Sequence, residues 1–403
     1  MYKYLRYPNM SDVTVDRVRQ KQKERMTKMK KITALILAVL MVVGMFTACS
    51  STEDTQKAES TTKNAATTVD PSADGSSDET YFPKTLQEIL DDIKSDRVKK
   101  VIFDADAGNE FDDQYALAYA LSSDKLNIVS VNASQFWNTA LVPDREAGMM
   151  KGYNEIKRIL TLLGREDIPV YKGVGDTVTK PDDDGIGLPE VIPVDAEAVD
   201  NIINTVKESK EIVYIITTGC ATNIACALAK DPSIKDNMCV VWLGADFYDT
   251  GGAGGFNMGQ DATAARYMMN SGVKLVWLPG ESSKDEAKGT HVLITGRKFL
   301  EESFPGDDPI SRCFGGEMAG AHDGGFYDDP EGWWHIYWDV AAPALFDTPE
   351  LCEFEIITLL RVRGDGVYDT NTDGRPECIV LNKLTDPQAV LDNMAAGINT
   401  FVK

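Results

Sequence analysis

The chain has little positive charge and no Cys-x-x-Cys pair. It holds 41 Lys and Arg residues against 63 Asp and Glu residues, a formal net charge of −22. Such a surface repels polyanions and bare anionic membranes, so a nucleic-acid partner is excluded. The spacing of the seven cysteines argues against a structural zinc site. Cys352 and Cys378 would be able to pair in an exported protein, and the sequence leaves their state open.

Long hydrophobic runs are also scarce. Residues 32–47 form an apolar run that follows three lysines, the length of a signal core and too short to span a bilayer comfortably. The end of this run and the two residues after it, Phe46-Thr47-Ala48-Cys49, resemble a bacterial lipobox in which Cys49 is lipidated, although Phe46 stands where leucine is usual. A simple membrane anchor or an ordinary cleaved signal is the alternative interpretation.

The amino-terminal 80 residues are therefore predicted to form a targeting signal followed by a flexible tether. Residues 1–48 are expected to be a lipoprotein signal; residues 1–25 are an unusual extension, because Met26 or Met29 would open a conventional one. Residues 49–80 are rich in Ser and Thr, and no aromatic residue lies between 50 and 80, so burial cannot offset their backbone entropy. We expect the protein to lie outside the cytoplasm, held to the bacterial cell membrane only by lipid on Cys49.

Residues 81–403 alternate between apolar runs and helical patterns. Strands are predicted at 99–104, 126–131, 168–171, 211–217, 238–243 and 274–278, and helices at 112–121, 145–163, 223–230 and 262–271. Strands that are apolar throughout and separated by helices indicate one α/β domain with a mainly parallel sheet covered on both faces. Later strands are expected to extend the sheet edge, with a polar hairpin turn between 360–362 and 378–381. The motif at 369–374 is not an EF-hand, because its twelfth position is Val380.

Acidic residues gather at the end of the first predicted strand. Four aspartates, Asp104, Asp106, Asp112 and Asp113, fall within ten residues at a strand-to-helix turn, where they repel one another unless a cation lies between them. Ligands of such sheets bind at the carboxyl edge, where segments 217–223 and 244–257 are also expected. Asp339 adds an acid at the head of an apolar helix. Carboxylates with a loop carbonyl are the ligands that Ca²⁺ prefers.

These motifs, in this order, resemble those of the inosine-uridine nucleoside hydrolase family. The matching elements are Asp104-x-Asp106-x-Gly108 with Asp112-Asp113, segment 168–173, Thr218-Gly219-x-x-Thr222-Asn223, Phe256-Asn257 with Asp261, and Asp339. The resemblance covers roughly residues 98–346. It implies the nucleoside hydrolase fold, with the active site at the carboxyl ends of the strands, and Ca²⁺-dependent cleavage of the N-glycosidic bond of a ribonucleoside or related N-riboside.

The resemblance also implies roles for single residues. It makes Asp106 both a Ca²⁺ ligand and the base that takes a proton from the attacking water, and it makes Asp113, Asp339 and the carbonyl of Thr218 further ligands. Asp112 and Asn257 match residues that bind ribose hydroxyls, Asn138 is a candidate third match, and Asp104 matches an aspartate with a supporting role. An anionic cluster suits this reaction, because positive charge develops on the sugar ring. Asp261 is expected only to cap a helix.

Three departures from the family pattern qualify this assignment. Asn109 and Glu110 lengthen the loop before Asp112, and Glu110 would either join the metal ligands or point to water. Gly255 replaces a glutamate that would hold the ribose 5′-hydroxyl, so a 5′-substituted ribose or another pentoside would fit. Trp338 replaces the histidine that commonly precedes the last aspartate.

His335 is then the best candidate for the acid that protonates the leaving base. It lies four residues before Asp339, on one face if that segment is helical, although a lone histidine among aromatic residues is more often structural. Nearby aromatic residues would either sandwich a base or pack in the core: Trp333, Trp334, Tyr337 and Trp338.

Two alternatives to a hydrolase remain open from sequence. One is a riboside-binding lipoprotein with weak or no hydrolysis, and the other is the solute-binding protein of a transporter, which would not need the aspartates. The sequence leaves open the preferred base and whether the protein forms a homo-oligomer.

Overall fold

The computed structural model describes residues 80–178, 189–285, 287–318, 327–329 and 332–402. These belong to one compact unit, Ser76–Lys403. Cys49, the signal, the tether and His322 lie outside the described residues. Within the described residues, no helix is long and apolar enough to cross a membrane.

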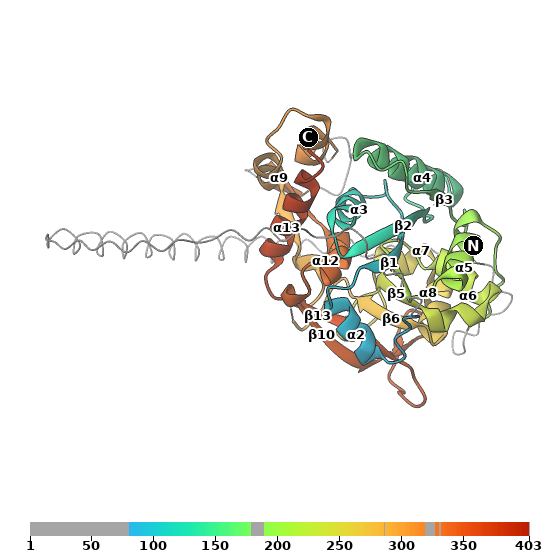
Figure 1. The fold of residues 1–403 in the computed structure, drawn as a ribbon. Coiled ribbons are helices and arrows are strands. Elements are labelled where there is room, and N and C mark those ends of the chain that lie inside the picture. The colour runs from blue at the N-terminus through green and yellow to red at the C-terminus, as the bar shows by residue number, and fades with distance from the viewer. Residues whose placement is uncertain (1–79, 179–188, 286, 319–326, 330–331, 403) are drawn as a thin grey trace, which may run out of the picture. The chain divides into compact units, whose positions relative to one another are not determined.

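An eight-stranded sheet forms the centre of the unit (Figure 1), in the order β10-β13-β6-β5-β4-β1-β2-β3. Its strands are β1 (Lys99–Ala105), β2 (Leu126–Ala133), β3 (Val170–Lys172), β4 (Val213–Thr217), β5 (Met238–Leu243), β6 (Lys274–Leu278), β10 (Cys352–Thr358) and β13 (Glu377–Leu384). All neighbours run parallel except β10, which is antiparallel to β13. The expected mainly parallel sheet is confirmed, and the later strands do extend its edge.

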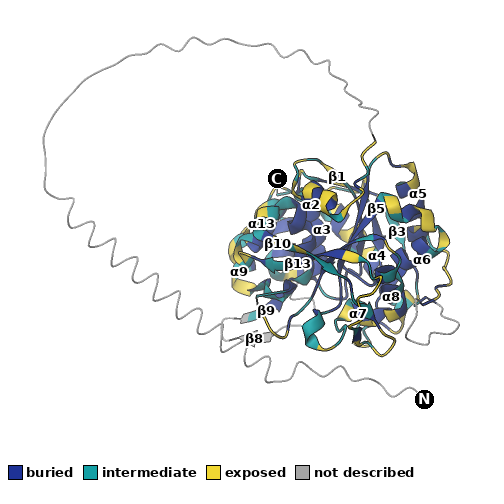
Figure 2. Ribbon diagram, turned by 90° about the horizontal axis from the view of Figure 1, so that it is seen from below, coloured by how far each residue is buried: buried dark blue, intermediate teal, exposed yellow. Residues whose placement is uncertain are grey.

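The strands are apolar throughout because both faces of the sheet are covered. Val101 and Phe103 of β1 pack into one hydrophobic cluster, whereas Ile102 packs into another. The first cluster is covered by α2 (Leu86–Lys94), α3 (Asp112–Ser122), α4 (Arg145–Leu162), α12 (Ala341–Asp347) and α13 (Pro387–Asn399). The second is covered by α5 (Glu197–Glu208), α6 (Thr222–Lys230) and α8 (Ala262–Asn270). Figure 2 shows the resulting buried interior.

Smaller elements surround this core. Short helices are α7 (Phe256–Gln260), α9 (Arg297–Ser303) and α10 (Pro309–Arg312), with the π-turn η4 (Cys313–Glu317) and 3-10 turns η1 (Pro232–Asn237), η2 (Tyr248–Thr250), η3 (Thr290–Val292), η5 (Trp338–Val340) and η6 (Pro349–Leu351). A second sheet has the order β7 (Ile294–Gly296), β9 (Gly332–Ile336), β8 (Tyr327–Asp329). Asp261 caps α8, as expected: its Oδ1 accepts a hydrogen bond from Ala264 N at 3.0 Å, and its Oδ2 accepts one from Thr222 Oγ1 at 2.9 Å.

Two details near the carboxyl terminus differ from expectation. The predicted hairpin is wrong: β11 (Arg361–Val362) pairs with β12 (Tyr368–Asp369), because a tight turn with Gly366 at φ +80° closes between them. Cys378 instead pairs with Ile357 of β10, and Cys352 with Leu384 of β13. The two cysteines therefore sit about 16 Å apart along the ribbon, and both are buried free thiols rather than a disulfide.

The strand order reverses beside β1. The chain moves outward from β1 to β2 and β3, then returns to place β4, β5 and β6 on the other side of β1. The connections that leave the carboxyl ends of β1 and β4 therefore diverge, and ligands of such sheets bind at a point of this kind. Any ligand site of this fold is expected at that point.

Candidate active site

Asp104 lies at this edge of the sheet. It is fully buried at the end of β1, and its Oδ2 accepts a hydrogen bond of 2.9 Å from Asn223 Nδ2 at the start of α6. Asn223 Oδ1 in turn accepts from Val174 N at 2.9 Å. Burial raises the pKa of Asp104 to about 7. The side chain therefore joins three segments of the fold, in keeping with a supporting role.

Four other aspartates converge in front of it, and we call them the acid cluster: Asp106, Asp112, Asp113 and Asp339. Each is at most 4% exposed. Carboxylate oxygens of Asp112, Asp113 and Asp339 lie within 4.8 Å of one another, although Asp339 is more than 200 residues away in sequence. Asp113 Oδ1 accepts from Thr218 Oγ1 at 2.6 Å, and Asp112 Oδ2 accepts from Asp339 N at 3.2 Å. The cluster thus sits between the ends of β1 and β4.

The electrostatics of the acid cluster are unfavourable without a cation. Burial raises the pKa of Asp106 well above its usual value, and the carboxylates of Asp113 and Asp112 raise it further. Burial and Glu110 raise the pKa of Asp112 to about 8, and burial raises that of Asp113 to about 6. Two full charges 4.8 Å apart repel by about 3 kcal/mol at an effective dielectric constant of 20. A cluster of four cannot be fully ionised unless positive charge compensates it.

The residues present fit a hard divalent cation. Asp106 Oδ2 is buried and has no hydrogen-bond partner among the described residues, so it can serve as a ligand. The available donors are carboxylate oxygens and the Thr218 carbonyl, an all-oxygen set typical of Ca²⁺ or Mg²⁺ sites. Asn257 Nδ2 holds that carbonyl at 2.5 Å and the Leu243 carbonyl at 2.9 Å. Both amide hydrogens of Asn257 are thereby used, which leaves its Oδ1 as an acceptor.

Asn138 lies in the loop after β2 and is half-buried. Its Nδ2 donates to Asn109 Oδ1 at 3.3 Å, and its Oδ1 accepts from Ala140 N at 3.1 Å. These bonds connect it to the inserted residues rather than to the acid cluster. The structure therefore brings Asp106, Asp112, Asp113, Asp339 and Thr218 together and leaves Asn138 at the rim.

The two-residue insertion forms a bulged loop held from α4. Gly108 has φ +88°, and Lys151 Nζ donates to its carbonyl at 2.6 Å. Beyond it, Glu110 turns back toward the site: its Oε2 lies 3.4 Å from His335 Nε2, while 44% of the side chain is exposed. Glu110 therefore contacts a histidine. The sequence predicted that it would either join the metal ligands or point to water, and neither prediction describes this partly exposed contact fully.

His335 reaches the site from a strand and not from a helix. It lies in β9, opposite Thr295 of β7, so the expectation of a helical face shared with Asp339 is wrong. The helical turn begins only at Trp338, because the preceding residues pair with β7. The imidazole ring is 5% exposed and packs 4.3 Å from the ring of Phe111, centroid to centroid. His335 thus stands beside Asp112, whose pKa it lowers.

The aromatic residues around His335 divide into two groups. Tyr337 is fully buried and packs edge-on against Phe111 and Tyr115, at centroid distances of 5.7 and 5.1 Å. Trp334 is 4% exposed. These two residues belong to the packing core, whereas Trp333 and Trp338 are only partly buried.

Sequence reasoning missed one carboxylate at this edge, Asp246. It follows β5, and a Cβ built on Gly254 or Gly280 would come within 2.4 or 2.8 Å of its carboxylate oxygens. Burial and then Glu281 raise its pKa to about 6. Gly255, where the family glutamate is absent, has φ +97° and would bring a Cβ to 3.4 Å from Ala245 N, next to Asp246. An acid three residues beyond an apolar strand, in a glycine-rich loop, was the available signal.

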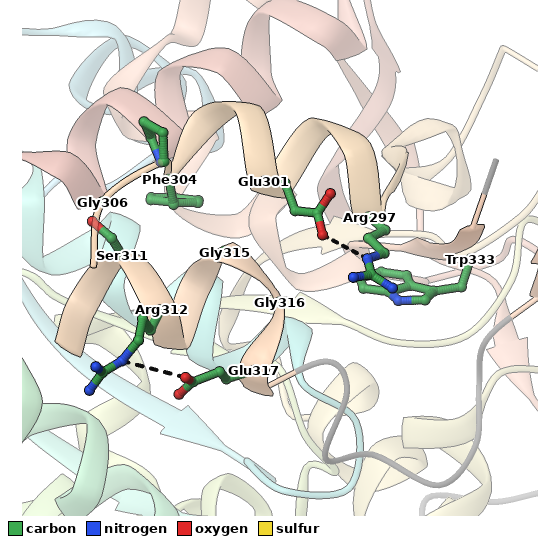
Figure 3. Close-up of a pocket in the computed structure, with 11 residues that line it drawn as sticks. Arg297, Glu301, Phe304, Gly306, Ser311, Arg312, Gly315, Gly316, Glu317 and Trp333 are labelled. Carbon is green, nitrogen blue, oxygen red and sulfur yellow. Dashed lines mark hydrogen bonds and ion pairs between the residues drawn. The ribbon is translucent and has the colours of Figure 1, made fainter. Parts of the chain in front are cut away.

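A separate pocket of about 500 Å³ lies between α9, α10, η4 and Trp333 (Figure 3). Its charged side chains are already paired, with Arg297 Nε 2.7 Å from Glu301 Oε1 and Arg312 Nε 3.4 Å from Glu317 Oε1. No member of the acid cluster lines it. Trp333, which lines this pocket, packs edge-on against Phe111 at a centroid distance of 6.2 Å.

Solved structures of nucleoside hydrolases share this fold. The plant nucleoside hydrolase PpNRh1 aligns with a TM-score of 0.55 at 20% identity, over 74% of this chain and 98% of that one. The purine-preferring ribonucleoside hydrolase from Gardnerella vaginalis aligns with a TM-score of 0.55 at 21% identity, over 75% of this chain and 99% of that one. At these identities the likeness concerns the fold alone.

Sequence comparison identifies the family. The chain is 32% identical over 192 residues to the pyrimidine-specific ribonucleoside hydrolase RihA of Citrobacter koseri, a match that covers 44% of this chain and 58% of that protein. The match to RihA of Salmonella newport has the same extent at 31% identity, so the chain spans 58% of the length of these curated relatives. The model of the family described as inosine-uridine preferring nucleoside hydrolase matches residues 101–319, more than half of the sequence. The chain belongs to the inosine-uridine preferring nucleoside hydrolase family.

Proposed function

We propose that this protein hydrolyses the N-glycosidic bond of a ribonucleoside or related N-riboside, with Ca²⁺ bound, and releases the free base and ribose. The observation that carries the proposal is the buried acid cluster at the carboxyl ends of β1 and β4. These aspartates stand where burial and mutual repulsion disfavour them, as is typical of a functional site. Relatives named as pyrimidine-specific and purine-preferring support the substrate class but no particular base.

The chain's own donors account for the metal requirement. Asp106, Asp113, Asp339 and the carbonyl of Thr218 would hold the cation, an all-oxygen set. Ca²⁺, when bound there, supplies positive charge that aligns the water and the ribose hydroxyls. The surrounding carboxylates carry the negative charge that stabilises the cationic sugar ring of the transition state.

Asp106 would act as the general base. Its buried Oδ2 has no hydrogen-bond partner among the described residues, so this carboxylate can accept a proton from water. Asp112 and Asn257 would bind the ribose hydroxyls; Asn257 Oδ1 can accept a hydroxyl hydrogen because its amide hydrogens are already used by main-chain carbonyls. Asn138, at the rim, would be a third sugar contact.

His335 would protonate the leaving base. Its ring packs against Phe111, and its donor atoms lie close to the carboxylates of Asp112 and Glu110, with Nε2 3.4 Å from Glu110 Oε2. This arrangement would replace the family histidine at the position of Trp338. On the sugar side, the absence of a carboxylate at Gly255 suits a 5′-substituted ribose or another pentoside.

We also propose that Cys49 is lipidated and that residues 50–80 hold the domain away from the bacterial cell membrane, outside the cytoplasm. The lysines, the apolar run and the lipobox-like segment support this location. Cells fed a labelled fatty acid should incorporate the label into the wild-type protein and not into Cys49→Ala. Incorporation into both proteins would contradict anchoring through Cys49.

The activity can be tested on the purified full chain with a panel of nucleosides, including 5′-substituted ones. Release of free base that stops with a chelator and returns with Ca²⁺ supports the proposal. Tight riboside binding without release would support a binding lipoprotein instead. Turnover that survives exhaustive chelation would contradict the role of the metal.

A further inference from the structure

We propose that Glu110, Asp112 and His335 form a second cation site, selective for a transition metal such as Zn²⁺, next to the Ca²⁺ site. Occupation of this site would inhibit the hydrolase. The inhibitory effect rests on the proposed function, whereas the binding of the metal does not.

The geometry of the three side chains carries the inference. One donor atom of each lies within 4.8 Å of the other two, and His335 Nε2 is 3.4 Å from Glu110 Oε2. His335 is nine-tenths buried, and its ring is fixed by Phe111 on one side and by the pairing of β9 with β7 on the other. A preformed imidazole aimed at two carboxylates is an arrangement that divalent transition metals bind.

Asp112 adds a second observation, because it belongs to both groups of closely spaced donor atoms. It is 2% exposed, and its Oδ2 accepts a hydrogen bond from Asp339 N. A carboxylate oxygen of Asp112 lies within 4.8 Å of donor atoms of Glu110 and His335, and another such contact joins it to Asp113 and Asp339. A buried carboxylate close to three other carboxylates is costly unless it meets a proton or a cation.

The donor type separates the two sites. The acid cluster with Thr218 offers only oxygen, which suits hard Ca²⁺, whereas the new group combines one nitrogen with two carboxylates. Nitrogen coordination favours Zn²⁺ over Ca²⁺. Glu110 is 44% exposed, so an ion can reach the group from solvent without opening the core.

Asp112 and His335 would serve both the reaction and the second metal. A Zn²⁺ ion on Asp112 would remove a carboxylate that binds the ribose, and one on His335 Nε2 would occupy the atom that gives a proton to the leaving base. Zinc would therefore lower the turnover number and the substrate affinity together. The inhibition would be reversed by a zinc-selective chelator while Ca²⁺ stays bound.

The test uses the full chain saturated with Ca²⁺ and titrated with Zn²⁺ alone, followed by calorimetry. The wild type should bind one Zn²⁺ without releasing Ca²⁺, and Glu110→Gln should bind it about tenfold or more weakly. His335→Asn should weaken binding to a similar extent. Glu301→Gln is the matched control, because Glu301 is half-exposed and paired only with Arg297 on α9.

The outcomes separate this inference from the proposed function. Unchanged zinc affinity in Glu110→Gln and His335→Asn, or release of one Ca²⁺ for each Zn²⁺ bound, would overturn the second site while leaving any nucleosidase activity intact. Selective loss of zinc binding in both variants would support the site even if no nucleoside were cleaved. With an active substrate in hand, zinc should inhibit wild type and Glu301→Gln alike, and inhibit Glu110→Gln only at about tenfold higher concentration.

Discussion

The two ends of the same strand pair, β1 and β4, hold buried aspartates in opposite conditions. At the amino end, Asp92 of α2 accepts hydrogen bonds from Arg97 Nε at 2.7 Å and from Tyr214 OH at 2.6 Å. Burial alone would raise the pKa of Asp92, but these partners outweigh it and the pKa is lowered. At the carboxyl end, Asp106 is equally buried, is surrounded by carboxylates, and has its pKa raised well above normal.

The difference teaches what distinguishes a structural acid from a functional one in this fold. Asp92 and Asp106 are both buried, so burial by itself does not distinguish a structural aspartate from a functional one. The Arg97 guanidinium satisfies Asp92 within the chain and also pairs with Glu211. Among the described residues, no arginine or lysine forms an ion pair with the acid cluster, and the raised pKa values indicate that the cluster needs a cation from outside the chain. Four variants or conditions would test that contrast.

The largest effect is expected for Asp106→Asn. Removing the proposed base should lower the turnover number on the order of 10³-fold. The metal-free variant should nevertheless melt no lower than the metal-free wild type, because one repulsive charge has been removed from the cluster. Nucleoside hydrolysis and thermal unfolding in chelator measure the two quantities. A variant that is fully active, or inactive because it is unfolded, would remove Asp106 from its assigned role.

Asp92→Asn should lower the stability of the fold and leave the metal site intact, the reverse of the effect expected for Asp106→Asn. Breaking a buried pair whose arginine is one-quarter exposed should lower the free energy of unfolding by about 2–3 kcal/mol, with little effect on Ca²⁺ affinity. Urea unfolding and calcium titration measure these changes. Asp91→Asn is the control, since Asp91 is exposed one residue away on α2 and accepts only from Gln87. Equal stability of the two variants would refute the contrast between the strand ends.

Calcium removal should make stability depend on pH. Folding raises the pKa of Asp113 to about 6 and that of Asp112 to about 8, from an ordinary value of 3.8. The folded, metal-free protein therefore holds more protons than the unfolded chain, so this cluster loses stability as the pH rises from about 4 to 8. At pH 8, Ca²⁺ at 100 times its dissociation constant should restore about 2.7 kcal/mol.

Thermal melts at pH 5 and pH 8, with chelator or with Ca²⁺, measure this effect. The difference in pH dependence of melting temperature between the wild type and Asp106→Asn gives the contribution of the acid cluster, because the other carboxylates of the chain are the same in both proteins. If the chelated wild type and the chelated variant showed the same pH dependence, Asp106 would not contribute to the electrostatic penalty.

The smallest effect is expected for Asp261→Asn. Asparagine still caps a helix, but its amide would face Val178 N, which donates to Asp261 Oδ2 at 2.9 Å. We expect a loss of about 1 kcal/mol in unfolding free energy and nearly full turnover. Denaturation and activity assays on one preparation provide both values. A large loss of activity would bring Asp261 into the catalytic machinery.

Much of the fold follows from local patterns that the sequence displays. Strands β1, β4 and β5 are uninterrupted apolar runs buried on both faces, and the parallel arrangement then brings the residues after each strand to one edge. For that reason Asp104, Asp106 and Thr218 could be grouped before any coordinates existed. Asp339 joined them as an acid at the head of an apolar helix and as part of the family resemblance.

Other features could not be read from local pattern. The spacing of His335 and Asp339 fits a helix as well as a strand, and only the pairing of β9 with β7 decides between them. The partner of Glu110 depends on how a two-residue insertion folds back, which is set by contacts with α4 and β9. The hairpin register of β10 and β13 depends on a ribbon, β11–β12, too short to leave a signal.

The amide of Asn257 has a thermodynamic consequence for the enzyme as a whole. Its Nδ2 donates a hydrogen bond to the Thr218 carbonyl, which is a proposed Ca²⁺ ligand, and its Oδ1 is the proposed acceptor for a ribose hydroxyl. A single planar amide group therefore contacts both the cation site and the sugar site. Cation and riboside should then bind with positive cooperativity, and reciprocity requires each to tighten the other by the same factor. Substrate would thereby help to retain the metal in surroundings where calcium is scarce.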